Sequence, residues 1–280
     1  MSRFSLLCRT AAAAAVLSLA AAGAAEAKTQ GQRYDDAPSS GRVLFVTTDQ
    51  NQLIRINSNR PDRVKDVRAI TGLAAGATLT GIDFRPATGD LYGVGSDSVV
   101  YRISPRTGIA VAEAPAFTPL LNGRFFGVDF NPTVDKIRVT SDAGLNLRLN
   151  VDEGTVLMND AALNPGMPRV VGSAYTNSSF NATRPTATML YAIDSAADTI
   201  SLQNPPNNGT LTNPRRLGFD LQDQSGFDIA GADNVGYIAT RMSRGSGLYT
   251  VDPVTGRSRF AGRIAGGARL VVTGLAAWQD

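Results

Sequence analysis

Gly127-Val128-Asp129-Phe130 is one of five copies of a short pattern that recurs along this 280-residue chain. Each copy begins with glycine and ends on an apolar or aromatic residue: Gly81-Ile82-Asp83-Phe84, Gly127-Val128-Asp129-Phe130, Gly172-Ser173-Ala174-Tyr175, Gly226-Phe227-Asp228-Ile229 and Gly274-Leu275-Ala276-Ala277. The steps between these glycines are 46, 45, 54 and 48 residues. A repeat of about 40–50 residues that contains only strands is typical of a β-propeller.

The second copy shows the repeating unit most clearly. Four short apolar runs, at residues 81–84, 91–95, 99–104 and 109–114, have the length of strands. Turns such as Pro86-Ala87-Thr88-Gly89 and Pro105-Arg106-Thr107-Gly108 separate them. Proline presets φ at the second turn position and glycine supplies a positive φ at the end, so the strands are expected to pair as antiparallel neighbours.

The two ends of the chain complement each other. Residues 43–47, 52–56 and 67–70 match the last three strands of a unit, and residues 273–278 match a lone first strand. Pairing these segments would complete one sheet and close the ring. The sequence therefore predicts an all-β, five-bladed propeller of four-stranded antiparallel blades, closed by the C-terminal strand joining the N-terminal blade.

The first residues are typical of a secretory signal peptide. Arg3 and Arg9 precede an apolar run over residues 11–25, and Ala25-Glu26-Ala27 is a cleavage site of the Ala-x-Ala kind. We expect residues 1–27 to be removed, 28–41 to be a flexible tail and 42–280 to form one propeller domain in the periplasm or outside the cell. No second long apolar run follows, so membrane insertion is not expected.

Composition excludes several kinds of chemistry. The chain has no histidine and its single cysteine, Cys8, precedes the cleavage site, which removes imidazole bases, thiol nucleophiles and His or Cys metal sites from the mature protein. Loss of Arg3, Arg9 and Glu26 reduces 27 basic and 24 acidic residues to 25 and 23. Such a balance offers no electrostatic attraction for nucleic acid.

One long segment resembles a known family. Residues 127–150 read Gly-Val-Asp-Phe-Asn-Pro-Thr-Val-Asp-Lys-Ile-Arg-Val-Thr-Ser-Asp-Ala-Gly-Leu-Asn-Leu-Arg-Leu-Asn and, with residues 81–93 and 248–256, resemble the bacterial family called domain of unknown function 4394. The resemblance spans about residues 43–278. It implies a secreted, propeller-like protein and no assigned activity, so no functional residue can be transferred from it.

Asp83, Asp129 and Asp228 occupy the same position in three first strands, which line the axis of a propeller. The favoured interpretation is structural: each carboxylate accepts hydrogen bonds from backbone N–H groups of the neighbouring blade. There are two alternatives. The three aspartates bind a cation, with Ca²⁺ as the candidate cofactor, or they serve as the acid and nucleophile of a carbohydrate-active hydrolase.

A second set of aspartates, Asp49, Asp97, Asp142 and Asp194, lies near turns and is interpreted as structural. Loops that join successive blades open on the same face as these turns. They carry the candidate ligand-binding residues Arg124, Arg169, Asp223, Gln224 and Arg269, where arginine could clamp a carboxylate or phosphate.

The sequence thus favours a non-catalytic scaffold that binds a protein, small molecule or glycan. Two interpretations of the polar insertion at residues 176–187 stay open: it is a functional loop, or it is a surface insertion that the fold tolerates.

Overall fold

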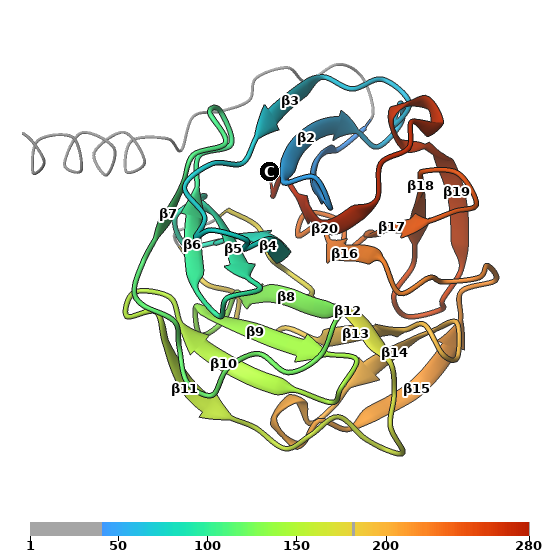
Figure 1. Cartoon of the computed structure of the whole chain (residues 1–280). Helices are drawn as coiled ribbons and strands as arrows, with labels where there is room; N and C mark the ends of the chain where they lie inside the picture. Colours follow the sequence, from blue (N-terminus) through green and yellow to red (C-terminus); the bar gives the residue numbers. More distant parts are fainter. Residues whose placement is uncertain (1–40, 181–182, 280) are drawn as a thin grey trace, which may run out of the picture.

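Five four-stranded antiparallel sheets surround a central axis in the computed structural model, which describes residues 41–180 and 183–279 (Figure 1). From the axis outward, blade 1 contains β20 (Val272–Ala277), β1 (Val43–Thr48), β2 (Gln52–Asn57) and β3 (Asp66–Ala69), and blade 2 contains β4 (Leu79–Phe84), β5 (Leu91–Gly95), β6 (Val100–Ile103) and β7 (Ala110–Ala112). Blade 3 contains β8 (Phe126–Asn131), β9 (Lys136–Ser141), β10 (Asn146–Asn150) and β11 (Thr155–Asn159), and blade 4 contains β12 (Val170–Tyr175), β13 (Leu190–Asp194), β14 (Thr199–Gln203) and β15 (Leu211–Arg216). Blade 5 contains β16 (Ser225–Ile229), β17 (Gly236–Arg241), β18 (Ser246–Val251) and β19 (Ser258–Arg263). The predicted five-bladed propeller is confirmed.

Strand β20 closes the ring by pairing antiparallel with β1, with Ala276 opposite Phe45 and Leu275 opposite Val46. In Figure 1 the red C-terminal strand accordingly lies in the same sheet as the blue strands from the start of the chain. The predicted signal peptide (residues 1–27) and nearly all of the predicted tail (28–41) lie outside the described residues.

The recurring glycines lie where innermost strands of neighbouring blades approach each other. A Cβ atom added to Gly127 would lie 2.3 Å from the backbone nitrogen of Ser173 in the next blade, and one on Gly226 would lie 2.6 Å from the backbone nitrogen of Leu275. Gly81 and Gly172 meet the following blade in the same way, and a Cβ on Gly274 would lie 3.2 Å from the Cα of Gly81. Real Cβ contacts are not this short, so the repeat begins with glycine because any side chain would push two blades apart.

Apolar side chains fill four of the five spaces between blades. One cluster joins blades 5 and 1 through residues such as Leu248 and Leu275, and comparable clusters join blades 1 and 2, 2 and 3, and 4 and 5. Between blades 3 and 4 the described apolar cluster is smaller, with Leu163, Val170 and Ala192 buried and Leu211 half-buried against them. That junction needs another source of cohesion.

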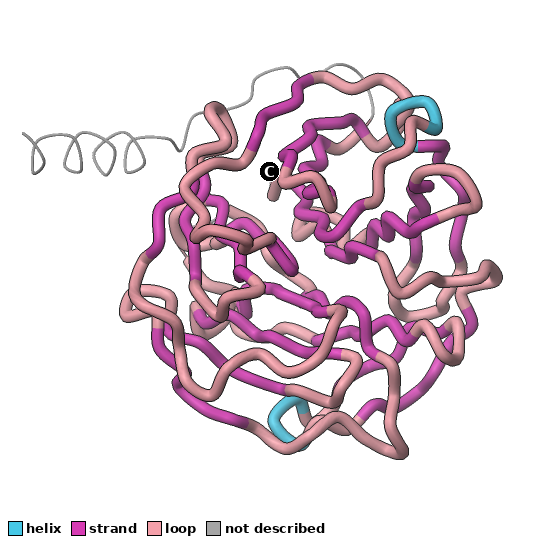
Figure 2. The backbone as a smooth tube through the Cα atoms, in the orientation of Figure 1, coloured by secondary structure: helices cyan, strands magenta, loops and turns pink. Residues whose placement is uncertain are grey.

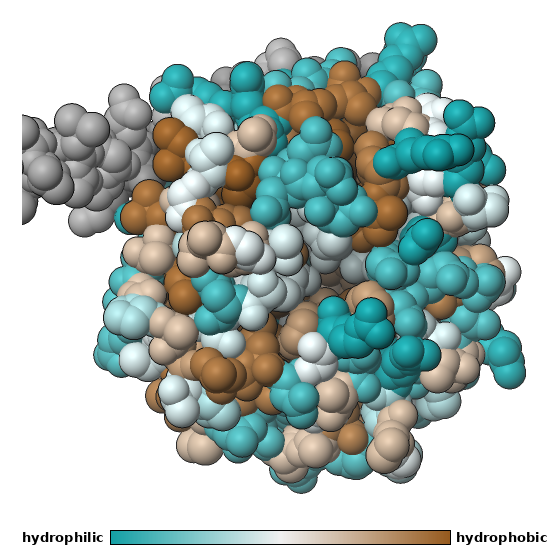
Figure 3. Space-filling view, viewed as in Figure 1, coloured by the Kyte–Doolittle hydropathy of each residue, from teal (hydrophilic) through white to brown (hydrophobic). Residues whose placement is uncertain are grey.

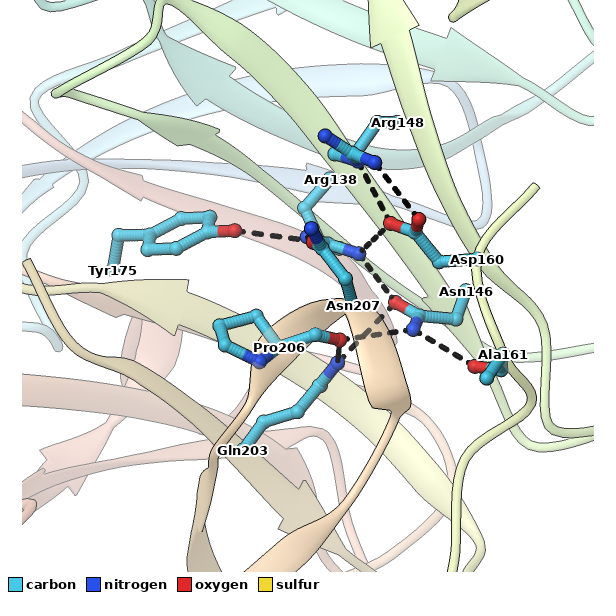
Figure 4. A network of polar contacts seen from close by, with 9 residues as sticks. All are labelled: Arg138, Asn146, Arg148, Asp160, Ala161, Tyr175, Gln203, Pro206 and Asn207. Atoms are coloured by element: carbon cyan, nitrogen blue, oxygen red, sulfur yellow. Dashed lines mark hydrogen bonds and ion pairs between the residues drawn. The ribbon is translucent and has the colours of Figure 1, made fainter. Parts of the chain in front are cut away.

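A buried polar network supplies it (Figure 4). Arg138 of β9, which is 2% exposed, pairs with Asp160 at 2.8 Å and donates to the Tyr175 hydroxyl of blade 4 at 3.2 Å. Arg138 also donates to Asn146 and to Asn207, whose turn belongs to blade 4. The charge is therefore both paired and hydrogen-bonded across the junction, as a buried arginine requires.

Strands dominate the described chain, and its helical content consists of two short 3₁₀ turns, η1 (Pro206–Asn208) and η2 (Ile264–Gly267) (Figure 2). Within the described residues, no helix has the length and apolar character needed to cross a membrane.

Candidate functional site

Three aspartates and five backbone N–H groups meet at the axis, one N–H group from each innermost strand. Asp83 accepts from Phe84 at 2.7 Å and Phe130 at 2.8 Å, Asp129 from Tyr175 at 3.0 Å, and Asp228 from Ile229 and Ala277, both at 2.6 Å. The innermost strand of each blade has no partner strand on its axial side, so these N–H groups need other acceptors. The hydrogen bonds predicted between each aspartate and the next blade are present.

One carboxylate oxygen remains without a donor. Five of the six oxygens accept a backbone N–H, whereas Oδ2 of Asp129 is buried and has no hydrogen-bond partner among the described residues. The three carboxyl groups present atoms that lie within 4.8 Å of one another. A proton on this Oδ2, donated to a neighbouring carboxylate, would relieve both the missing bond and the repulsion.

The electrostatics of the cluster agree with such a shared proton. Burial raises the pKa of Asp228 to about 7, although the N–H groups of Ala277 and Ile229 oppose the rise. Burial also raises the pKa of Asp83 and Asp129 well above the ordinary value, and repulsion from the neighbouring aspartates adds to it. Desolvation disfavours every charged form here, so the cluster holds protons more tightly than exposed aspartates do.

Both ends of this layer are closed. Toward one end, the glycine layer leaves a cavity of only about 10 Å³. Toward the other, Gln279 contacts Asp228 at 3.3 Å, and Phe180 from the 176–187 insertion packs edge-on against Trp278 with ring centroids 4.6 Å apart. A glycosidase needs its two carboxyl groups beside an open sugar-binding pocket, so this geometry does not support the hydrolase alternative.

The Ca²⁺ site at Asp83, Asp129 and Asp228 stays a prediction. Calcium takes six to eight oxygen ligands, and the N–H groups leave one carboxylate oxygen uncommitted. The metal content of the purified protein would test it.

A larger cavity, of about 250 Å³, lies on the axis at the opposite end of the innermost strands, where β4, β8, β16 and β20 begin. We call it the axial cavity. Its lining consists of Thr78, Leu79, Thr80, Ser96, Leu121, Gly123, Arg124, Phe125, Phe126, Asp223, Gln224, Ser225 and Thr273. Four blades contribute to it, so the ring itself creates this site.

Three of the five predicted ligand-binding residues meet in this cavity. Arg124, Asp223 and Gln224 come from two loops about 100 residues apart and all line it. Arg169 lies at its edge through an ion pair with Asp223, with 3.1 Å between nitrogen and oxygen. Arg269 is exposed and is not among the lining residues.

Of the two charged residues described in the lining of the axial cavity, Asp223 is paired and Arg124 is not. Asp223 is occupied by Arg169 and by the hydroxyl of Ser195 at 2.8 Å. Within the described residues Arg124 forms no ion pair, and its guanidinium lies 5.8 Å from the ring centroid of Phe125. An exposed arginine free of acids can bind a ligand oxygen anion with two parallel hydrogen bonds.

Two of the turn aspartates hold the loops that carry the arginines. Asp142 accepts from the backbone N–H groups of Arg124 at 2.8 Å and Phe125 at 3.2 Å, and Asp194 accepts from Arg169 at 3.2 Å. Their role was predicted as structural, within their own turns. Asp194 does accept from Ala196 of its own turn at 2.8 Å, whereas the bonds of Asp142 go to the incoming loop. These loops are thereby fixed at the axial cavity.

Sequence reasoning missed the residue before each repeat glycine. Thr80, Phe126, Ser225 and Thr273 occupy this position in four blades, and all four line the axial cavity. Their position in the repeat was a usable signal, because residues at one position of each blade lie at one level of the axis.

These features define a five-bladed propeller with a polar cavity at one end of its axis and a sealed carboxyl layer within it. The family model described as Domain of unknown function (DUF4394) matches residues 52–276, and the chain belongs to that family. No curated protein matches the chain.

Two solved structures are similar over most of its length. One, a structural genomics protein of unknown function from Bacteroides thetaiotaomicron, has 14% identity and a TM-score of 0.47, with 80% of this chain and 58% of that one covered. The other, the Dos1 propeller, has 10% identity and a TM-score of 0.42, with 79% and 62% covered. The chain thus spans about three fifths of the length of each.

Proposed function

We propose that this chain is an exported, non-catalytic propeller that binds a small polar ligand in the axial cavity. The observation that carries the proposal is the convergence of Arg124, Asp223 and Gln224, from separate loops, on one cavity that four blades build. Binding sites of propellers and barrels commonly lie where loops of a rigid scaffold meet.

The size and chemistry of the cavity limit the ligand. Its volume of about 250 Å³ is below the usual range for drug-sized molecules, which favours a single sugar or small metabolite. Arg124 favours a ligand that carries a carboxylate or phosphate. On the face seen in Figure 3, hydrophobic residues form groups interrupted by hydrophilic ones, which favours a small polar ligand over a broad apolar protein interface.

A thermal-shift screen of residues 28–280 tests this function. The panel contains monosaccharides, sugar phosphates and short dicarboxylates. A ligand at about 100 times its Kd adds about 2.7 kcal/mol to the free energy of unfolding, a Tm rise of about 5–10 °C for a domain of this size. We expect Arg124→Ala and Gln224→Ala to abolish the rise.

Arg60→Ala, which removes an exposed arginine of blade 1 outside the cavity lining, is the matched control and should keep the rise. A panel in which no compound raises Tm, or in which the rise survives Arg124→Ala, contradicts the proposal.

Export rests on the basic, apolar and Ala-x-Ala segments of residues 1–27. Mass spectrometry of the protein recovered from a bacterial periplasm should give a chain that begins at Lys28. Recovery of the intact chain from the cytoplasm alone would contradict export.

A further inference from the structure

A second cavity, of about 610 Å³, lies between blades 4 and 5 at the opposite ends of their strands. Ser225, at the start of β16, lines the axial cavity, whereas the turn that follows β16 lines this one. Its lining comes from the start of β13, the β16–β17 turn and the β18–β19 turn. We call it the interblade cavity, and its volume suits a small organic ligand.

A buried hydroxyl group faces this cavity without a good partner. Tyr191 of β13 is 5% exposed and lines the cavity. Its only hydrogen-bond partner among the described residues is the sulfur of Met189, at 3.9 Å. A thioether is a weak acceptor, so the Tyr191 hydroxyl retains a donor for a ligand.

Two arginines lie on one side of the cavity. Arg257 and Arg259 are exposed, line the cavity and form no ion pair within the described part of the chain. They follow the Pro253-Val254-Thr255-Gly256 turn on either side of Ser258. Alternation along an extended strand places their side chains on the same face.

The acids of the cavity are already occupied. Asp252 accepts from the backbone N–H groups of Val254 at 2.9 Å and Thr255 at 3.3 Å within its own turn. Asp233 accepts from Val235 at 3.1 Å and pairs with Arg42 at 3.4 Å. Asp252 keeps its charge, because a hydrogen bond from Thr255 and the nearby Arg257 lower the pKa of that carboxyl. Counted with Arg42, the two acids and two arginines of the lining leave a net charge of +1. The rest of the wall is largely apolar and includes Met189, Val235, Val251, Pro253 and Val254.

We propose that the interblade cavity binds a small organic anion. Arg257 and Arg259 hold its carboxylate or phosphate group, the Tyr191 hydroxyl donates a hydrogen bond, and the remainder of the molecule lies against the apolar wall. This site is separate from the axial cavity, shares no lining residue with it and does not depend on the function proposed there.

Isothermal titration calorimetry on residues 28–280 with four probes tests the inference: glucose 6-phosphate, glucuronate, inorganic phosphate and glucose. We expect saturable binding of at least one of the two sugar anions with a Kd of about 1 mM or tighter. Inorganic phosphate should bind more weakly because it leaves the apolar wall uncovered. Glucose should not bind because it lacks the anionic group.

Arg257→Ala/Arg259→Ala should weaken this binding about tenfold or more, and Tyr191→Phe should weaken it several-fold while keeping the ring. The control is Arg60→Ala/Arg63→Ala, which removes two exposed arginines of blade 1 and should leave the Kd unchanged. Arg124→Ala should also leave it unchanged, which separates the two cavities. Absence of saturable binding of both sugar anions, equal binding of glucose, or binding that survives loss of both arginines overturns the inference.

Discussion

At the scale of single residues, the axial aspartates act as acceptors for backbone groups. Five N–H groups donate to five of the six carboxylate oxygens, and Oδ2 of Asp129 is the oxygen without a donor. Asp83 uses both its oxygens as acceptors, for Phe84 and Phe130. The three aspartates occupy equivalent positions of the repeat, yet they differ in whether each can be replaced by asparagine without loss of a hydrogen bond.

The matched substitutions Asp83→Asn and Asp129→Asn test this difference. An amide at position 83 would turn an NH₂ group toward a backbone N–H, so we expect a loss of about 1–3 kcal/mol in the free energy of unfolding. An amide at position 129 can accept from Tyr175 and donate to a neighbouring carboxylate, so stability should change little or rise. Urea unfolding of both variants measures this, and equal losses would contradict it.

The same cluster predicts an unusual dependence of stability on pH. The pKa values of Asp83, Asp129 and Asp228 are raised by burial, that of Asp228 to about 7, from an ordinary value of 3.8. Between these values the folded chain binds more protons than the unfolded chain. Its stability from this source is complete below about pH 4 and is lost as the pH rises through about 7.

The free energy of unfolding from urea curves should therefore be lower at pH 8 than at pH 5.5. Asp129→Asn removes one of the repelling carboxyl groups and should make the decrease smaller. A wild-type protein that is equally stable at both pH values, or more stable at pH 8, would rule out the protonated cluster.

At the level of elements, Phe180, in the described part of the 176–187 insertion, packs at one end of the axis. Phe180 contacts Trp278 and also Phe84, with ring centroids 5.9 Å apart in the second pair. The backbone N–H of Phe180 donates to Gln279 at 2.9 Å. Phe180 therefore links the C-terminal residues to blade 2 and contributes to packing, a role that neither interpretation of the polar sequence included.

Phe180→Ala should lower the free energy of unfolding by about 2 kcal/mol, because two edge-on ring contacts and half-buried apolar surface are lost. For a domain of this size the Tm should fall by about 4–8 °C. Phe260→Ala, which removes a ring that is 46% exposed on the outermost strand β19, is the control and should have a smaller effect. Equal melting shifts would show that Phe180 adds nothing to packing.

At the scale of the whole molecule, β20 joins the two ends of the chain. It pairs with β1, provides Gly274 to the glycine layer and donates the Ala277 N–H group to Asp228. Loss of this strand removes an entire neighbour from blades 1, 2 and 5 at once.

Deletion of residues 270–280 should therefore open the ring and abolish the cooperative thermal transition followed by circular dichroism. A chain that starts at Gly41 should melt as the chain from Lys28 does. An unchanged melting curve for the truncated chain would refute closure by β20.

Local patterns predicted most of the fold and part of the site. Strand-length runs, Pro-x-Thr-Gly turns and incomplete units at both ends specified the blades and their closure, because a hairpin depends on residues close in sequence. The loops that carry Arg124 and Gln224 followed from the same count of blades. Boundaries differed most at the outer edge, where the strand predicted at 109–114 is β7, Ala110–Ala112.

The repeated glycine also shows where sequence reasoning ended. Its recurrence specified five similar units, but its cause is the approach of Gly127 to Ser173 in another blade. The polar junction around Arg138, the unpartnered oxygen of Asp129 and the two cavities likewise join residues from different blades. Hairpins are determined by residues that are neighbours along the chain. The contacts between blades form only when five blades pack around one axis, so they follow from the tertiary structure and not from local sequence.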